Sequence, residues 1–230
     1  MPASDRLLQI YGMLLEQYGP QYWWPAETPF EVCIGAILTQ NTSWSNVEKA
    51  IASLKAADLL TVSAIAGLEP SVLAALIRPA GYFNVKAVRL QQFVRFLQTQ
   101  HQGCLEHLFA GPWQETRAEL LAVKGIGPET ADSILLYAGH KPSFVVDAYT
   151  RRIFSRLGLV TPESGYHVVR DFFMHNLPQD CALFNEYHAL LVAHAKQACR
   201  TQPRCAACCL APACTRQNQI VDVFCNKHLT

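Results

Sequence analysis

Cysteines concentrate near the C-terminal end of this chain in a pattern suited to metal binding. Nine of the 230 residues are cysteine, and five of these lie between positions 199 and 214. Four of the five are separated by intervals of five, two and five residues: Cys199, Cys205, Cys208 and Cys214. Four thiolates at such close spacing can surround one metal centre, either zinc or a [4Fe–4S] cluster, and the spacing alone does not choose between them.

A carboxylate is a second candidate for chemistry. Asp147 follows the apolar run Phe144-Val145-Val146 and precedes a helical pattern that begins near Ala148. An aspartate in this position is typical of a helix N-cap. Capping is compatible with catalysis, because the same helix amides hold a carboxylate ionised and aim it.

A glycine-rich turn is the third candidate. Residues 120–132 contain an apolar helix pattern, the sequence Gly125-Ile126-Gly127 and the start of another helix. Two glycines let the backbone turn sharply and come close to a partner, and the free N–H groups of the second helix can bind a phosphate without reading its base. The pattern is either a helix–hairpin–helix that binds nucleic acid or an ordinary helical hairpin with a glycine cap.

The elements that position these groups are helices. Apolar residues recur at three- and four-residue spacing along most of the chain, and strand patterns are nearly absent. Glycine and proline divide the chain into roughly ten helices of ordinary length. We therefore expect an all-α protein. The sequence has no internal repeat and no long linker, so a division into lobes must come from packing.

Composition narrows the class of protein. Half of the residues are hydrophobic, which indicates a globular fold. The net charge of +1 is too small for a broad basic face. Up to Leu120 there are 8 basic and 10 acidic residues, and after it 11 and 8, so a basic surface would be local and mostly C-terminal.

The beginning of the sequence lacks the features of a secretory signal, and no apolar run is long enough to span a bilayer. We therefore expect a cytoplasmic protein that does not bind membranes. In that compartment a metal or redox role explains the clustered cysteines better than disulfide bonds do.

The order of the three motifs resembles the endonuclease III superfamily of DNA-repair glycosylases. Val-Val-Asp ends twenty residues after Gly127, and the four-cysteine segment follows it. The segment 30–42, which contains Gln40-Asn41-Thr42, and the segment 80–87 also resemble this family. Three motifs in register are far more specific than any one of them, and the resemblance covers nearly the whole chain.

The resemblance implies two helical lobes. Residues 28–140 would form a six-helix barrel that carries the helix–hairpin–helix. Residues 1–27 and 141–230 would form the second lobe, from the N-terminal helix and the C-terminal segment with its [4Fe–4S] cluster. The protein would act as a monomer, and double-stranded DNA containing a damaged base would bind in the cleft between the two lobes. Asp147 would lie at the rim of this cleft.

The resemblance also assigns DNA contacts. Gln40 would fill the gap left by a flipped nucleotide, or else serve as a buried cap. Arg200 and Arg204, inside the first cysteine interval, would contact phosphates, or else be solvated surface residues. That interval has five residues where the family usually has six, so Cys209 is an alternative to Cys208 as the third ligand. The remaining expected DNA contacts are Asn41, Lys124, Gly125, Gly127 and Thr130.

The type of glycosylase depends on one hairpin position. In bifunctional members of the family a hairpin lysine forms a Schiff base with the sugar. The matching residue here is Glu129, which cannot form an imine, and Lys124 lies on the other side of the turn. We therefore expect a monofunctional enzyme in which Asp147 stabilises an oxocarbenium-like sugar and orients or activates a water. Glu129 would lie at the base pocket or be a solvated helix residue.

Two further matches resemble the 3-methyladenine DNA glycosylase branch of the superfamily: the hairpin sequence 123–132 and Tyr-Trp-Trp-Pro at 22–25. The resemblance implies a base pocket lined by Trp24, Pro25 and Trp44. A cationic alkylated purine stacks favourably on such electron-rich rings. Packing within a lobe is the alternative role for these tryptophans.

Other functions remain open. A glycosylase for mismatched or oxidised bases would share the motifs, although the adenine-removing relatives generally carry a further C-terminal domain and this chain ends sixteen residues after Cys214. A bifunctional glycosylase/AP lyase is a further alternative. A helix–hairpin–helix DNA-binding module without chemistry is the non-enzyme alternative, and Asp147 argues against it. A prokaryotic member would be associated with the nucleoid.

Overall fold

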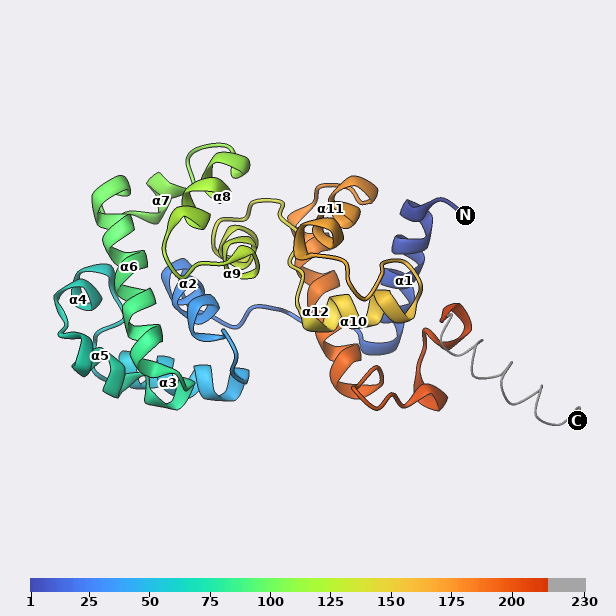
Figure 1. The fold of residues 1–230 in the computed structure, drawn as a ribbon, viewed down its shortest axis with the longest axis horizontal. Coiled ribbons are helices and arrows are strands. Elements are labelled where there is room, and N and C mark those ends of the chain that lie inside the picture. Colours follow the sequence, from blue (N-terminus) through green and yellow to red (C-terminus); the bar gives the residue numbers. More distant parts are fainter. Residues whose placement is uncertain (215–230) are drawn as a thin grey trace, which may run out of the picture. The chain divides into compact units, whose positions relative to one another are not determined.

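A computed structural model describes residues 1–214, and all regular secondary structure in this range is helical, which confirms the all-α prediction (Figure 1). Twelve α-helices lie within it. They outnumber the roughly ten expected from the periodicity because several, such as the four-residue α7, are too short to show a repeating pattern. Among these helices none combines the length and apolar character needed to cross a bilayer.

The helices, in chain order, are α1 (Ala3–Tyr18), α2 (Pro29–Leu38), α3 (Trp44–Ala56), α4 (Val62–Gly67), α5 (Pro70–Leu76), α6 (Phe83–His101), α7 (Leu105–Leu108), α8 (Trp113–Ala122), α9 (Pro128–Ser133), α10 (Ala148–Arg156), α11 (Tyr166–Asn176) and α12 (Cys181–Gln197). Shorter helical segments are η1 (Arg78–Ala80), η2 (Ile134–Ala138), η3 (Cys205–Ala207) and η4 (Ala211–Ala213). The segment η2 has π-helical geometry and directly continues α9.

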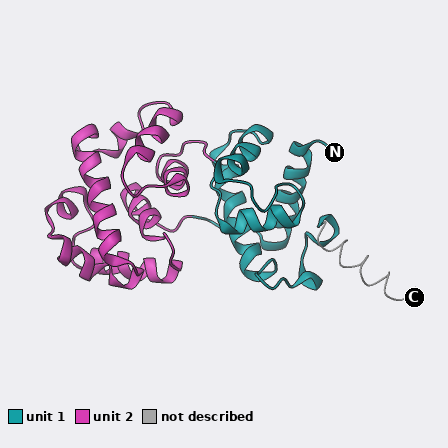
Figure 2. Ribbon diagram, viewed as in Figure 1, with its two compact units in different colours: residues 1–23, 144–230 teal, residues 24–143 magenta. Residues whose placement is uncertain are grey.

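The chain forms two compact units (Figure 2). Unit 1 comprises Met1–Trp23 and Phe144–Thr230, and unit 2 comprises Trp24–Ser143. Unit 1 is therefore assembled from segments on both sides of unit 2 in the sequence.

Unit 2 is built around α2. All residues from Glu31 to Leu38 are buried, and the helix packs against α3, α6, α9 and η2. A helix that is apolar on every side forms the centre of a core. Its start is encoded locally, because the Thr28 hydroxyl accepts from the N–H of Glu31 at 3.1 Å and the Glu31 carboxylate accepts from the N–H of Glu27 at 3.1 Å.

A buried lysine fixes the other end of α2. Lys86, on α6, is 1% exposed, and its ammonium group donates to the carbonyl oxygens of Leu38 at 2.9 Å and Ala80 at 2.7 Å. Burial, followed by the nearby charge of Arg89, lowers the pKa of Lys86. These bonds satisfy carbonyls that a helix end leaves without partners. They therefore fix the backbone just before Gln40.

The hairpin comprises α8, the turn that follows it, and α9. Gly125 has φ of +97°, in the region that disfavours side chains, and a Cβ there would lie 2.5 Å from Cγ of Arg89. The two helices are joined by a bidentate ion pair, in which Arg117 contacts the fully buried Asp132 at 2.7 and 2.9 Å. The positive φ and the closeness of Arg89 thus require a glycine at position 125, and the ion pair holds the two helices on either side of it.

Unit 1 has an aromatic core that joins its two chain segments. The rings of Phe144 and Phe173 stack with centroids 3.9 Å apart, and Phe154, Phe184 and Tyr187 pack around them edge to face. The Tyr187 hydroxyl donates to the carbonyl of Leu7 in α1 at 2.8 Å. Helix α12 packs against both α1 and α10, and so holds the start of α10 in place.

Candidate active site

Asp147 caps α10. Its Oδ1 accepts from the N–H of Thr150 at 2.7 Å and from the Thr150 hydroxyl at 2.9 Å. The Asp147 side chain is 15% exposed and Thr150 is fully buried. The N-cap geometry expected from the sequence is therefore present, on a side chain that keeps a small exposed fraction.

A histidine from α12 lies beside the second oxygen of this carboxylate. Nε2 of His188 is 3.5 Å from Oδ2 of Asp147, and the His188 side chain is 8% exposed. Burial acts to raise the pKa of Asp147, but the contact with His188 and the hydrogen bonds from Thr150 outweigh it, so that this pKa lies below its usual value. Asp147 is therefore ionised at neutral pH.

In unit 2 the structure brings Gln40 together with the hairpin. Nε2 of Gln40 donates to the carbonyl oxygen of Gly125 at 3.1 Å and to the hydroxyl of Thr130 at 2.9 Å. Its Oε1 accepts from the guanidinium of Arg89. Gln40 thus connects the segment after α2 to the hairpin in this structure. Its neighbour Asn41 is exposed and has φ of +55°.

The other hairpin residues lie at the surface. Lys124, Gly127 and Glu129 are exposed. Gly127 has φ of −92°, and a Cβ there would meet nothing within 4 Å, so the fold itself does not require glycine at this position. Position 127 therefore differs from position 125, where the positive φ and the closeness of Arg89 both require glycine.

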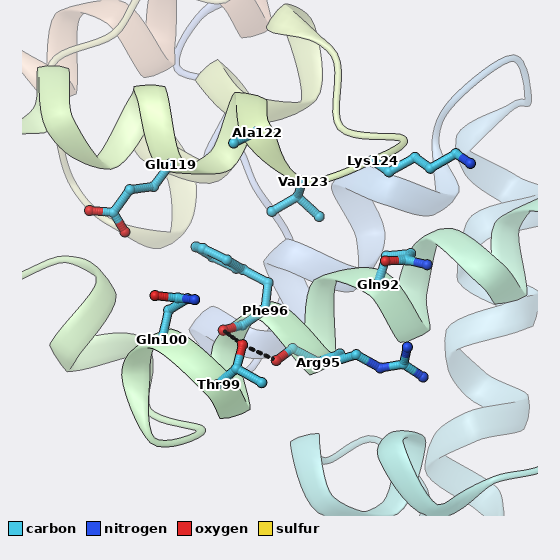
Figure 3. A pocket seen from close by; sticks show the side chains of 9 residues that line it. All are labelled: Gln92, Arg95, Phe96, Thr99, Gln100, Glu119, Ala122, Val123 and Lys124. Carbon is cyan, nitrogen blue, oxygen red and sulfur yellow. Dashed lines mark hydrogen bonds between the residues drawn. The ribbon is translucent and has the colours of Figure 1, made fainter.

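A cavity of about 480 Å³ lies between α6 and α8, on the side of the hairpin where Lys124 projects (Figure 3). Arg95, Phe96, Glu119 and Val123 contribute to its lining. Of the residues expected at the site, it contains Lys124 alone. The cavity therefore does not coincide with the aromatic residues expected to bind a base.

Three aromatic rings gather in unit 2. Trp24 lies against Trp44 with ring centroids 4.9 Å apart and against Tyr137 with centroids 5.0 Å apart. Both tryptophans are half-buried, whereas Tyr137 is 6% exposed. Trp24 also packs on Gly35 of α2, where a Cβ would lie 3.4 Å from its ring. We call Trp24, Trp44 and Tyr137 the aromatic group. Pro25, next to Trp24 in the chain, is exposed.

The cysteine segment is tied to α10. The guanidinium of Arg156 donates to Sγ of Cys199 at 3.3 Å and to the carbonyls of Arg200 at 2.6 Å and Thr201 at 2.9 Å. Sγ of Cys214 donates to the carbonyl of Arg156 at 3.2 Å. One arginine therefore holds both ends of the segment, on which Arg200 itself is exposed.

The middle of the cysteine segment faces α12 and α1. Sγ of Cys208 is 3.6 Å from Nε2 of His194, whose Nδ1 is 2.9 Å from the hydroxyl of Tyr18. Burial lowers the pKa of His194 to about 4, so its imidazole is neutral at neutral pH. Arg204, which directly precedes Cys205, is exposed.

The chemistry of the donor set fits an iron–sulfur cluster. Burial, followed by the neighbouring thiols of Cys209, Cys199 and Cys205, raises the pKa of Cys208 to about 11, so these groups are close enough to interact. Within residues 1–214 no three His, Cys, Asp or Glu side chains are grouped tightly enough to hold a metal ion. In a [4Fe–4S] cluster each thiolate binds a different iron, so its four sulfurs stand farther apart than the ligands of one ion.

Three residues of these sites have no local sequence signal: His188, Arg89 and Tyr137. Each lies in an apolar or mixed helical pattern where a core or surface role is the ordinary expectation. Helix packing brings them to Asp147, Gln40 and Trp24 respectively. Only the tertiary structure could have identified them.

Comparison with known proteins places these features in a family. The model of the HhH-GPD superfamily of base excision DNA repair proteins matches residues 34–179, a range that includes the hairpin and Asp147. A protein of Methanocaldococcus jannaschii that carries the name of a DNA repair glycosylase is 48% identical over 213 residues, which are 91% of this chain and 96% of that protein. Endonuclease III of Thermotoga maritima is 31% identical over 191 residues, 81% of this chain and 82% of the relative.

Solved structures agree with these sequence matches. The crystal structure of H. pylori 3-methyladenine DNA glycosylase bound to 1,N6-ethenoadenine is similar with a TM-score of 0.72 and 31% identity, and covers 86% of this chain and 98% of that one. A complex of endonuclease III with DNA shares the fold with a TM-score of 0.82 at 20% identity, and covers 96% and 100%. The chain belongs to the HhH-GPD superfamily of base excision repair proteins, and it is a DNA glycosylase of the endonuclease III type.

Proposed function

We propose that this glycosylase is monofunctional and that it hydrolyses the N-glycosidic bond of an alkylated base of the 3-methyladenine type. The observation that carries the proposal is the aromatic group, which presents two half-buried indole rings beside Tyr137. The H. pylori relative, named a 3-methyladenine DNA glycosylase, supports the same substrate class.

Asp147 supplies the charge for the reaction. As the glycosidic bond breaks, its electron pair leaves with the base and positive charge develops on the sugar. An ionised carboxylate stabilises that charge and orients a water, which adds to C1′ and gives up a proton to the carboxylate. The lowered pKa of Asp147 supports this role, because the carboxylate remains ionised at neutral pH.

The base is bound by aromatic stacking. An alkylated purine such as 3-methyladenine is cationic, and the electron-rich faces of Trp24 and Trp44 attract a cation. Such a base is also a good leaving group, so no strong general acid is needed to protonate it. The ring contacts of Trp24 with both other members hold its indole in a defined orientation.

No lysine is proposed to act as a nucleophile. Glu129 occupies the position of the family's Schiff-base lysine, and its carboxylate cannot form an imine with the sugar. Lys124 is exposed on the other side of the turn. The product is therefore an abasic site in an intact strand.

We propose that the hairpin and the exposed arginines bind the DNA backbone. Gly127 is the N-cap of α9, and the lack of a side chain there leaves room for a phosphate at the helix N-terminus. Arg200 and Arg204 add positive charge on the cysteine segment. Asn41 is exposed for contact with the duplex, whereas Gln40 must exchange its bonds to the hairpin before it can enter the gap.

We propose that Cys199, Cys205, Cys208 and Cys214 hold a [4Fe–4S] cluster, as their number and close spacing allow. When bound, the cluster would fix the loop that carries Arg200 and Arg204. Anaerobically purified protein should contain about four irons per chain. Cys208→Ser should lose iron and Cys209→Ser should retain it. Stoichiometric zinc without iron would overturn this assignment.

A substrate panel tests the proposed function. Purified protein is incubated with duplexes that each carry one 3-methyladenine, uracil or oxidised pyrimidine, and the products are separated with and without alkali. We expect the 3-methyladenine duplex to react fastest and to be cleaved only after alkali is added. Faster release of uracil or of an oxidised pyrimidine would overturn the alkylated-base assignment.

A further inference from the structure

The two oxygens of the Asp147 carboxylate have different surroundings. Oδ1 accepts two hydrogen bonds from Thr150, at 2.7 and 2.9 Å, and its acceptor positions are therefore filled. Oδ2 lies 3.5 Å from Nε2 of His188. An ionised carboxylate oxygen has two acceptor positions, so Oδ2 can face His188 and a reacting group at the same time.

The fold holds His188 at this place. Its helix, α12, packs against α10, which begins directly after Asp147, and against α1. The preceding residue, Tyr187, is fully buried in the aromatic core and is hydrogen-bonded to Leu7. His188 itself is 6% exposed, so its imidazole is buried within the packing of unit 1.

Several polar and charged side chains on the helices that pack against α12 have contacts elsewhere in unit 1. On α10, Arg152 donates to the carbonyl of Cys199 at 3.0 Å, and Arg156 contacts the cysteine segment. On α1, the Tyr18 hydroxyl contacts His194, and the pKa of Tyr11 is raised by burial and then by Glu186 and Asp180. Nε2 of His188, by contrast, lies 3.5 Å from Oδ2 of Asp147.

We infer that His188 is a positioning residue for catalysis: it fixes the plane of the Asp147 carboxylate and directs the second acceptor position of Oδ2 toward the sugar. This inference rests on the proposed catalytic role of Asp147. His188 acts through Asp147 and does not itself contact the substrate.

Two consequences distinguish this role from a structural one. A misoriented carboxylate slows base release without weakening DNA binding, because phosphate contacts are made elsewhere. In addition, His188 is one of the groups that lower the pKa of Asp147, and its removal raises that pKa because burial is then opposed only by the hydrogen bonds from Thr150. The acidic limb of the pH–rate profile then moves to higher pH, because Asp147 becomes protonated earlier as the pH falls.

The test uses three variants of the full-length protein. His188→Leu removes the imidazole, and His188→Gln retains a neutral N–H donor. His175→Gln is the matched control, because His175 is an exposed histidine of the same unit that contacts the carbonyl of Asp171. Single-turnover release of 3-methyladenine is measured across pH, affinity for a duplex with an abasic-site analogue is measured by anisotropy, and folding is checked by thermal unfolding.

We expect His188→Leu to slow base release roughly 10- to 100-fold at unchanged affinity, and to shift the acidic limb upward. His188→Gln should recover most of the rate at neutral pH while its acidic limb stays shifted, and His175→Gln should match the wild type. If His188→Leu does not fold, the pH–rate profile of His188→Gln decides the question.

A wild-type rate and pH–rate profile in the His188 variants, with Asp147→Asn inactive, would overturn this inference alone. Full activity of Asp147→Asn would instead overturn the proposed function on which it rests. The two failures are therefore distinguishable.

Discussion

Asp147 in unit 1 and the aromatic group in unit 2 are held by different kinds of force. Directional contacts fix Asp147: two hydrogen bonds from Thr150 to one oxygen and His188 beside the other. The aromatic group is held by ring packing, with centroid separations of 4.9 and 5.0 Å. Hydrogen bonds fix the orientation of the charged group, whereas ring packing fixes the shape of the surface on which a base can stack. We therefore expect substitutions at Asp147 to reduce rate and substitutions in the aromatic group to reduce selectivity.

The largest effect should come from Asp147→Asn. Asparagine keeps the size and some of the capping ability of aspartate but loses the charge that faces the sugar cation, so base release should fall by on the order of 100- to 1,000-fold. Affinity for damaged DNA should change little. Single-turnover kinetics and anisotropy measure the two quantities separately.

Asp180→Asn is the matched control for this substitution. Asp180 caps α12 in the same unit and accepts from the N–H groups of Ala182 and Leu183 at 2.7 and 3.1 Å. Asp180→Asn should destabilise its helix about as much as Asp147→Asn destabilises α10, but without loss of activity. Equal losses of activity in both variants would mean that Asp147 acts only as a cap.

A smaller effect is expected from Trp24→Ala and Trp44→Ala. Each removes a face on which the base stacks, worth about 1–3 kcal/mol, so the preference for 3-methyladenine over uracil should fall roughly 10- to 100-fold. The measurement is kcat/KM on both duplexes. Trp113→Ala, at a half-buried tryptophan that begins α8, is the control and should keep the preference. Wild-type preference in both aromatic-group variants would contradict the pocket assignment.

The smallest effects concern the two hairpin glycines. Gly125→Ala places a side chain at φ of +97° and against Arg89, and should lower the free energy of unfolding by about 2 kcal/mol. Gly127→Ala should lower it by under about 1 kcal/mol, because its backbone is extended and its surroundings are open. Denaturant unfolding compares the two free energies.

Gly127→Ala should nevertheless weaken DNA binding more than it slows base release, because the new methyl group obstructs the approach of a phosphate. Anisotropy titrations and single-turnover rates compare the two effects. A slowed single-turnover rate at unchanged affinity would contradict the positioning role of the hairpin.

The local motifs were predictable from the sequence because each carries its own signal. An aspartate between an apolar run and a helix predicts the cap at position 147, and the Gly-Ile-Gly sequence predicts the hairpin. Tryptophans at positions 24 and 44 suggested a common pocket only through the family resemblance, and the structure now brings their rings together.

The partners of these motifs were not predictable. His188 and Tyr137 lie in helices whose apolar pattern indicates core packing, and Arg89 is one of several polar residues on α6. Their roles arise from contacts between segments far apart in sequence, such as the bond from Arg89 to Gln40. Short helices such as α4 and α7 escaped detection for a different reason, since six or four residues do not show a period.

Trapping with borohydride tests most directly the central claim that Asp147 promotes hydrolysis without an amine nucleophile. Borohydride is added during turnover of a 3-methyladenine duplex, and covalent enzyme–DNA adducts are separated on a denaturing gel beside a bifunctional glycosylase as positive control. We predict free base and intact abasic strands with no adduct, because Glu129 cannot form an imine. An adduct that forms with the wild type and disappears in Lys124→Ala would contradict the account, because it would show that a lysine attacks the sugar.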